Sequence, residues 1–218
     1  MKIQKLFDLD KTIAAKLFDG IEYPWQALSK IKEFTVSLGK SLDKEKFDEV
    51  SPDVWISKSA KVAPTAFIAP PCIIDEGAEV RHCAFIRGGV IIGKSCVVGN
   101  STEMKNAVIF DNVQIPHFNY VGDSILGYKS HLGAGAVTSN VKSDKTLVTI
   151  KNGNEKIETG LKKFGAMVGD YTEVGCNSVL CPGTVIGKNS TIYPLSRVRG
   201  YLKENSIFKS EENIVEKN

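Results

Sequence analysis

The sequence predicts an all-β protein, a parallel β-helix of six-residue repeats with a short helical segment at its N-terminus. Three observations support this fold class. An apolar residue recurs at every sixth position from Ile56 to Phe110, a compact residue follows four positions after it, and the same period returns from Val168 to Val198. A helix has a period of about 3.6 and an ordinary strand a period of about 2, so a period of six indicates short strands joined by tight turns.

Within each block the apolar positions are separated by six residues. They are Ile56, Val62, Ile68, Ile74, Val80, Ile86, Ile92, Val98, Met104 and Phe110, then Val168, Val174, Leu180, Ile186, Ile192 and Val198. Each turn of such a chain stacks its apolar residue on that of the next turn and so builds one continuous core. The alternative, a β-sandwich of short strands, requires spacings of about 8–12 residues with scatter, which this chain does not show.

The first 50 residues lack the six-residue period and are expected to form a helical cap. The sequence predicts one short helix over 11–18 and a second from Pro24 to about Leu38. We expect these helices to cover the open end of the coil and to shield its edge strand. A partner-binding arm is the alternative.

The β-helix is expected over residues 51–202. Residues 139–165 separate its two repeat blocks, and a hairpin is predicted there around Asn152–Gly153. Long loops on a rigid coil commonly carry function. Residues 203–218 form a polar C-terminal tail without an assigned structure.

Composition and charge exclude several classes of function. The chain has 28 Lys and Arg against 25 Asp and Glu, and these charges are dispersed, so no nucleic-acid partner is expected. No apolar run is long enough to cross a membrane, and Asp8 and Asp10 stand where a signal peptide would be apolar, so a cytoplasmic protein is expected. The five cysteines show neither disulfide nor zinc spacing, and no metal site is expected.

The period is disturbed after Phe110. The next apolar positions are Ile115, Val121, Leu126 and Leu132, at steps of five, six, five and six residues. Local rules tend to fail where function or strain is located. We therefore expect this region to protrude from the coil or to kink it, and to place functional side chains in a cleft.

Two basic residues and one histidine near this disturbance suggest a site for an anionic substrate. Arg87 and Lys105 each follow an apolar position and are 18 residues apart, so they stack if one turn contains three repeats. A phosphate would neutralise two stacked cations, although two solvated basic residues are the alternative. A neutral imidazole at His117 can remove a proton from an attacking amine, although a structural histidine is the alternative.

Three longer motifs resemble one enzyme family. The stretches GNSTEMKNA, HFNYVGDSILG and LGAGAVTSN are similar to the acetyltransferase domain of the bifunctional bacterial enzyme that makes UDP-N-acetylglucosamine, and more so to that of archaeal sugar-phosphate nucleotidylyltransferases. The resemblance covers residues from about 54 to 200. It implies a left-handed, triangular β-helix, a homotrimer with active sites between subunits, and transfer of an acetyl group from acetyl-CoA to glucosamine 1-phosphate.

The resemblance also implies roles for individual residues. His117 would be the general base, and the phosphate would be held by Arg87 and Lys105. The remaining acceptor residues would be Tyr120, Asn140, Lys145 and His131, the last standing where the bifunctional enzyme has asparagine. The donor acetyl-CoA would lie against Ala134, Cys176 and Pro194. Tyr193–Pro194 replace small residues of the family there, which would either block or reshape the channel for CoA.

Three functions therefore remain open. The first is an N-acetyltransferase that acts on an amino-sugar phosphate or a nucleotide sugar. The second is a non-catalytic trimer that binds such sugars and has lost the donor site. The third, a metal-dependent hydro-lyase with three histidines, is disfavoured because His82, His117 and His131 are not separated by whole turns of the coil.

Overall fold

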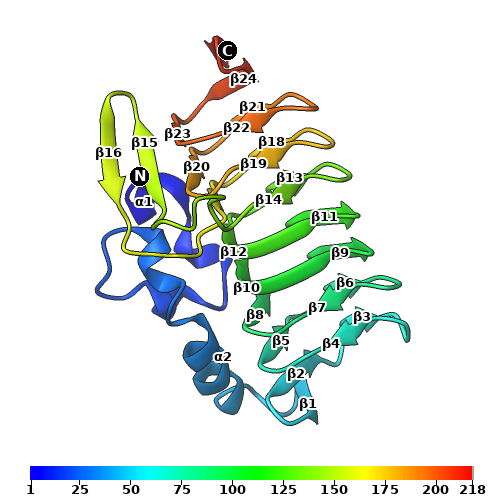
Figure 1. The fold of residues 1–218 in the computed structure, drawn as a ribbon. Coiled ribbons are helices and arrows are strands. Elements are labelled where there is room, and N and C mark those ends of the chain that lie inside the picture. The colour runs from blue at the N-terminus through cyan, green and yellow to red at the C-terminus, as the bar shows by residue number, and fades with distance from the viewer. Residues whose placement is uncertain (218) are drawn as a thin grey trace.

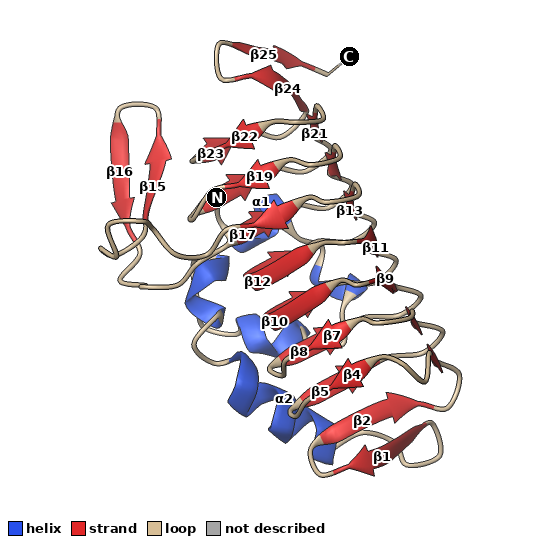
Figure 2. Cartoon of the chain, turned by 45° about the vertical axis from the view of Figure 1, so that its right-hand side comes forward, coloured by secondary structure: helices blue, strands red, loops and turns tan. Residues whose placement is uncertain are grey.

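The computed structural model describes residues 1–217 and shows a triangular column of stacked coils (Figure 1). Every coil contributes one short strand to each of three faces, and strands of successive coils pair in parallel. The coils wind in a left-handed sense from β1 at one end to β24 at the other (Figures 1 and 2). The predicted left-handed parallel β-helix is therefore confirmed.

The first face is the nine-stranded sheet. Its strands are β3 (Lys61–Val62), β6 (Glu79–Val80), β9 (Val97–Asn100), β11 (Gln114–His117), β13 (His131–Leu132), β18 (Glu173–Val174), β21 (Thr191–Ile192), β24 (Ser206–Ser210) and β25 (Asn213–Glu216). The strand β25 is antiparallel to β24 and covers the C-terminal end of the column. The polar tail therefore continues the sheet.

The second and third faces form one 14-stranded sheet that bends around a corner. The second face contains β4 (Phe67–Ile68), β7 (Phe85–Ile86), β14 (Val137–Thr138), β19 (Val179–Leu180) and β22 (Arg197–Val198). The third contains β2 (Val54–Ser57), β5 (Cys72–Ile74), β8 (Val90–Ile92), β17 (Ala166–Val168), β20 (Thr184–Ile186) and β23 (Tyr201–Leu202), with β1 (Phe47–Ser51) antiparallel to β2. Both faces are crossed by β10 (Glu103–Ile109) and β12 (Tyr120–Leu126).

The repeat predicted from the sequence builds the core, except at its tenth position, where Ile109 and not Phe110 pairs with Ile92. Met104 lies between Ile86 and Val121 in the parallel ladder, and all three side chains are fully buried. Each strand hydrogen-bonds to the coil below and to the coil above, so the backbone groups beside these apolar files are paired within the ladder.

The disturbed region neither protrudes nor kinks, so that prediction is wrong. Cys72 pairs with Val90, eighteen residues later, whereas Val90 pairs with Ala107, seventeen residues later. The shorter coil has one residue fewer at the corner between the second and third faces. Gly88–Gly89 turn this corner in one coil, and the single residue Asn106 turns it in the next; all three have positive φ. The coil has shortened, and its strands have become continuous.

The N-terminal helices lie along the third face, beside the coil, and not over its open end (Figures 1 and 2). They are α1 (Ile3–Leu6), α2 (Ile31–Lys40) and three 3-10 turns, η1 (Leu9–Lys11), η2 (Ala15–Phe18) and η3 (Pro24–Ala27). They cover a stripe of outward-facing apolar residues on that face, all fully buried: Ile73, Ile91, Val108, Ile125, Met167 and Val185. Burying this stripe gives the helices their position. The end of the coil is covered by β1.

The predicted helix over 11–18 is wrong, because the chain forms two separate 3-10 turns there, one that ends at Lys11 and one over Ala15–Phe18. Thr12 Oγ1 accepts a hydrogen bond from the backbone N–H of Ala14 at 3.1 Å, a local bond that competes with helix formation. The second helix begins later than predicted, after the 3-10 turn at Pro24. No helix within residues 1–217 has the length and apolar character needed to span a membrane.

The excursion between the repeat blocks leaves the column at the corner between the second and third faces. It contains the hairpin β15 (Thr149–Asn152) and β16 (Glu155–Glu158). Phe164 is fully buried where the chain returns to the coil, and its ring stacks on Trp25 at 5.9 Å between centroids. The excursion is thus packed against the N-terminal segment.

Candidate functional site

Arg87 and Lys105 stack on the second face, as their spacing predicts. Ile86 pairs with Met104, so the two basic residues that follow them lie on neighbouring coils. Each cation has one acidic partner: Arg87 Nη1 lies 2.7 Å from Glu103 Oε1, and Lys105 Nζ lies 3.7 Å from Asp123 Oδ2. We call Arg87 and Lys105 the cationic column.

Asp123 organises the polar groups beside this column. Its side chain is 7% exposed, and its oxygens accept hydrogen bonds from Asn106 Nδ2, at 2.9 Å, and from Asn140 Nδ2. Asn140 Nδ2 also lies 3.3 Å from the Tyr120 hydroxyl. The structure therefore brings Tyr120 and Asn140 together with Lys105, and all three belong to the predicted site.

The Tyr120 hydroxyl is held in its protonated form. Burial raises the pKa of Tyr120, and the negative charges of Asp123 and Glu103 raise it further. Because Asn140 donates to this oxygen, the phenolic proton is available to an acceptor on a bound ligand. Tyr120 can therefore donate a hydrogen bond to a sugar hydroxyl or to a phosphate oxygen.

The cationic column faces an open groove of about 390 Å³. One wall comes from the coil and the other from the N-terminal segment. The lining residues are Leu28, Ser29, Lys32, Arg87, Gly88, Lys105, Asn106 and Asp123.

The spacing argument missed the carboxylate at Asp123 and the amide at Asn106. Both stand at the corner between the second and third faces, where an earlier coil has Gly88–Gly89, and both have positive φ. Polar residues inside the apolar runs KNAVI and GDSIL are the signal that could have identified them. Asn and Asp tolerate this backbone conformation better than other side chains.

His117 lies on another file, at the corner between the first and second faces. The backbone N–H of Gly135 donates to the carbonyl of His117 at 3.0 Å. In the next two coils, Asn177 donates in the same way to the carbonyl of Ala134, and Leu195 to that of Cys176. The residues placed one above another by these bonds are His82, Asn100, His117, Ala134, Cys176 and, at the next turn, Pro194. We call this file the corner column. It contains the predicted base and all three predicted donor-site residues.

The two columns lie at opposite edges of the second face. Tyr120 begins that face three residues after His117, and it stands beside Glu103, two positions from Lys105. The His117 side chain is exposed, and within residues 1–217 its ring makes no hydrogen bond to the chain. A ligand that touches both columns would lie across the second face.

Two predicted acceptor residues are not at this face. His131 lies on the first face, where its Nδ1 is 2.8 Å from Glu173 Oε2. Lys145 is exposed in the excursion, and its backbone N–H bonds to Lys142 O. A single chain therefore does not bring His131 or Lys145 to Lys105 and Asp123.

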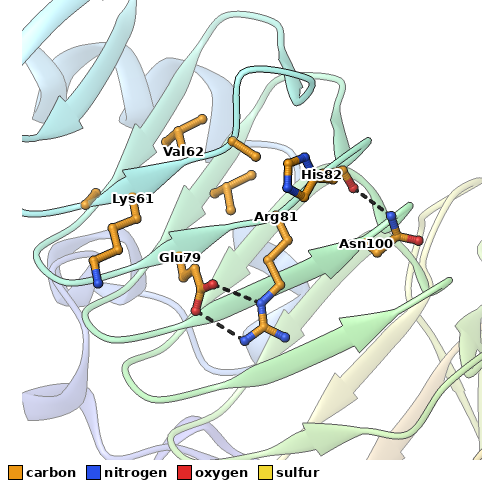
Figure 3. Close-up of a pocket in the computed structure, with 9 residues that line it drawn as sticks. Lys61, Val62, Glu79, Arg81, His82 and Asn100 are labelled. Atoms are coloured by element: carbon orange, nitrogen blue, oxygen red, sulfur yellow. Dashed lines mark hydrogen bonds and ion pairs between the residues drawn. The ribbon is translucent and has the colours of Figure 1, made fainter.

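A second hollow, of about 610 Å³, lies on the first face beside His82 (Figure 3). Its guanidinium group, from Arg81, is already held by both oxygens of Glu79, at 3.1 and 3.2 Å (Figure 3). None of the predicted site residues lines it. The predicted phosphate-binding residues Arg87 and Lys105 therefore line the groove beside the cationic column and not this hollow.

The chain is similar to several known proteins. The family model of the GMPPB C-terminal domain matches residues 68–154. The Bifunctional protein GlmU of Methanococcus maripaludis is 31% identical over 224 residues, which cover 99% of this chain and 54% of that protein. The Bifunctional sugar-1-phosphate nucleotidylyltransferase/acetyltransferase of Sulfurisphaera tokodaii is 30% identical over 176 residues, 81% of this chain and 43% of that protein. The chain carries hexapeptide repeats and is similar to part of these bifunctional proteins. It spans about half the length of the curated relatives it matches.

Solved structures to which the chain is similar include a putative acetyltransferase from Bacillus cereus, with 14% identity and a TM-score of 0.41. That alignment covers 74% of this chain and 76% of the other. They also include a point mutant of AntD, an N-acyltransferase from Bacillus cereus in complex with dTDP-4-amino-4,6-dideoxyglucose and Coenzyme A, with 16% identity and a TM-score of 0.40. That alignment covers 75% of this chain and 79% of the other.

Proposed function

We propose that this hexapeptide-repeat protein is an acetyl-CoA-dependent N-acetyltransferase that acts on an amino-sugar phosphate resembling glucosamine 1-phosphate, or on a nucleotide sugar. The observation that carries the proposal is the arrangement on the second face. The cationic column, Asp123, Asn140 and the hydroxyl group of Tyr120 lie at one edge, and the corner column with His117 lies at the other. The name of the Sulfurisphaera relative, which includes both a sugar 1-phosphate and an acetyltransferase, supports the same class of substrate.

In the proposed reaction the cationic column binds the phosphate, and the Tyr120 hydroxyl donates to the sugar. The His117 imidazole accepts a proton from the amine while the amine nitrogen attacks the thioester carbonyl of acetyl-CoA. The new C–N bond forms and the C–S bond breaks, and the proton leaves with the sulfur as free CoA thiol. Holding both substrates on one face supplies much of the acceleration, because it replaces a bimolecular encounter by a fixed geometry.

We further propose a cytoplasmic homotrimer with the second face at the boundary between subunits. The exposure of His117 in the single chain supports this assembly, because a neighbouring copy could complete the pocket around it. His131 and Lys145, which a single chain leaves away from Lys105, would then act on a neighbour's site. Light scattering of the purified protein tests the assembly, and a monomeric mass would contradict it.

The activity is tested by release of free thiol from saturating acetyl-CoA with glucosamine 1-phosphate as acceptor. We expect release that depends on the amino sugar. The second candidate function, a non-catalytic sugar-binding trimer, is motivated by Tyr193, which is 43% exposed next to Pro194 on the corner column. Binding of the sugar phosphate without binding of CoA in calorimetry would favour that second function over the first.

The position of the donor predicts a pattern of thiol reactivity. Cys83 and Cys176 are both exposed near the corner column, whereas Cys72 and Cys96 are buried. Burial raises the pKa of Cys72 to about 12 and raises that of Cys181 as well, so their reactive thiolates are scarcer. We expect iodoacetamide to modify Cys83 and Cys176 first, as measured by peptide mass spectrometry. Acetyl-CoA should slow modification of Cys176 and leave that of Cys83 unchanged; equal rates with and without CoA would contradict the proposed donor site.

A further inference from the structure

Lys32 of α2 reaches into the groove of the cationic column. Its Cγ and Cε lie 2.9 and 3.4 Å from the point that a Cβ on Gly89 would occupy. Its aliphatic chain therefore lies over the corner that directly follows Arg87. A side chain larger than that of glycine at position 89 would collide with the Lys32 chain. Gly89 also has a φ of 65°, a backbone conformation that favours glycine.

A hydrogen-bonded bridge fixes α2 in this place. Asn106 Nδ2 donates to the carbonyl of Leu28, at 3.2 Å, and to Asp123 Oδ1, at 2.9 Å. One amide therefore joins the segment before α2 to the carboxylate that pairs with Lys105. Ile31 and Thr35 are fully buried against the coil. The wall that carries Lys32 is thus packed and bonded to the site.

The charges around the groove are not balanced. Glu103 and Asp123 pair with Arg87 and Lys105, whereas the Lys32 ammonium has no acidic partner within 4.0 Å in residues 1–217. Three cations and two carboxylates leave one excess positive charge facing one space. An ammonium group on a flexible chain is a common phosphate ligand, and the excess charge matches an anion bound between α2 and the coil.

We propose that Lys32 is a third phosphate-binding residue of the acceptor site, so that the N-terminal helical segment forms part of the substrate pocket. This inference rests on the proposed function, because it assumes a phosphorylated acceptor on the cationic column. The ligand chemistry is a phosphate ester of an amino sugar. The phosphate can be that of a sugar 1-phosphate or that of the diphosphate in a nucleotide sugar.

The test compares Lys32→Met with Lys40→Met in the full chain. Methionine keeps the aliphatic chain over Gly89 and removes the charge, and Lys40 is an exposed lysine at the other end of α2. Isothermal titration calorimetry with glucosamine 1-phosphate and with UDP-linked glucosamine should show about tenfold weaker binding for Lys32→Met. Lys40→Met should bind as the unaltered protein does. In the acetyl-transfer assay, KM should rise by the same factor while kcat stays unchanged.

The two ligands distinguish the two sources of phosphate. The two variants distinguish a failure of the inference about Lys32 from a failure of the proposed function. The acceptor that loses more affinity in Lys32→Met is the one whose phosphate lies against Lys32. If Lys105→Met weakens binding and Lys32→Met does not, the inference about Lys32 is overturned and the proposed function stands. If neither variant changes the affinity for either ligand, the cationic column does not bind phosphate, and the proposed function falls with the inference.

Discussion

Replacing His117 by alanine should lower kcat by at least about 100-fold, because a positioned general base contributes about 10²–10⁴ to the rate of proton transfer. The ring is exposed and makes no hydrogen bond within residues 1–217, so its removal should leave folding unchanged. KM for the acceptor should change little, since the phosphate and the sugar are held by Lys105 and the hydroxyl group of Tyr120, which lie at the other edge of the face. Steady-state release of CoA thiol measures both constants.

The matched control is His82→Ala. His82 lies on the same corner column, two coils below, and its Nδ1 pairs with the Thr65 hydroxyl at 3.1 Å. It is outside the proposed site, so this variant should keep its activity. An undiminished rate in His117→Ala would remove the general base from the account, and an equal loss in both variants would point to damage of the corner and not to lost chemistry.

Replacing Gly99 by alanine should give the largest loss of stability in the coil. Gly99 lies opposite Pro116 on the next coil, and an added Cβ would stand 1.5 Å from the Pro116 carbonyl oxygen. The clash is with backbone, which cannot rotate away, so the coils must separate. Overpacking costs about 1–3 kcal/mol, and we expect at least the upper end of that range. The thermal midpoint should fall by about 6–12 °C, since each kcal/mol shifts it by about 2–4 °C at this size.

Gly153→Ala is the control for the added methyl group. Gly153 turns the hairpin of the excursion with no atom within 4 Å of its Cβ position. The substitution therefore destabilises the protein only because alanine is strained in the left-handed backbone conformation, by about 1–2 kcal/mol. Differential scanning calorimetry of both variants makes the comparison. If Gly99→Ala unfolds at the same temperature as the unaltered protein, the close contact between β9 and β11 is not present in solution.

The coil could be predicted from the sequence because equivalent positions in successive coils have the same surroundings. Met104 and its neighbours are buried where the six-residue spacing puts them, and Arg87 and Lys105 stack for the same reason. The helices were misplaced because the spacing identifies only the side chains that point inward. Outward apolar residues such as Ile73 and Ile91 stand between two inward ones, in the runs CII and VII, and they show which face needs a cover.

The site was predictable where it depends on the coil. Tyr120, Lys105 and Asn140 come together as their motifs imply. Lys32 was not predictable, because no period connects an N-terminal helix to a corner of the coil. The disturbed rhythm after Phe110 was also misread. A residue had been lost from a corner, and the parallel pairing continued through it.

The central claim is that the second face binds a phosphorylated amino sugar on stacked cations. Calorimetric titration of glucosamine 1-phosphate and of unphosphorylated glucosamine into the unaltered protein and into an Arg87→Met, Lys105→Met double variant tests it most directly. The account predicts that the phosphate ester binds much more tightly than glucosamine and that the double variant abolishes this difference. Equal affinities for the two ligands, or a preference that survives in the double variant, would contradict it.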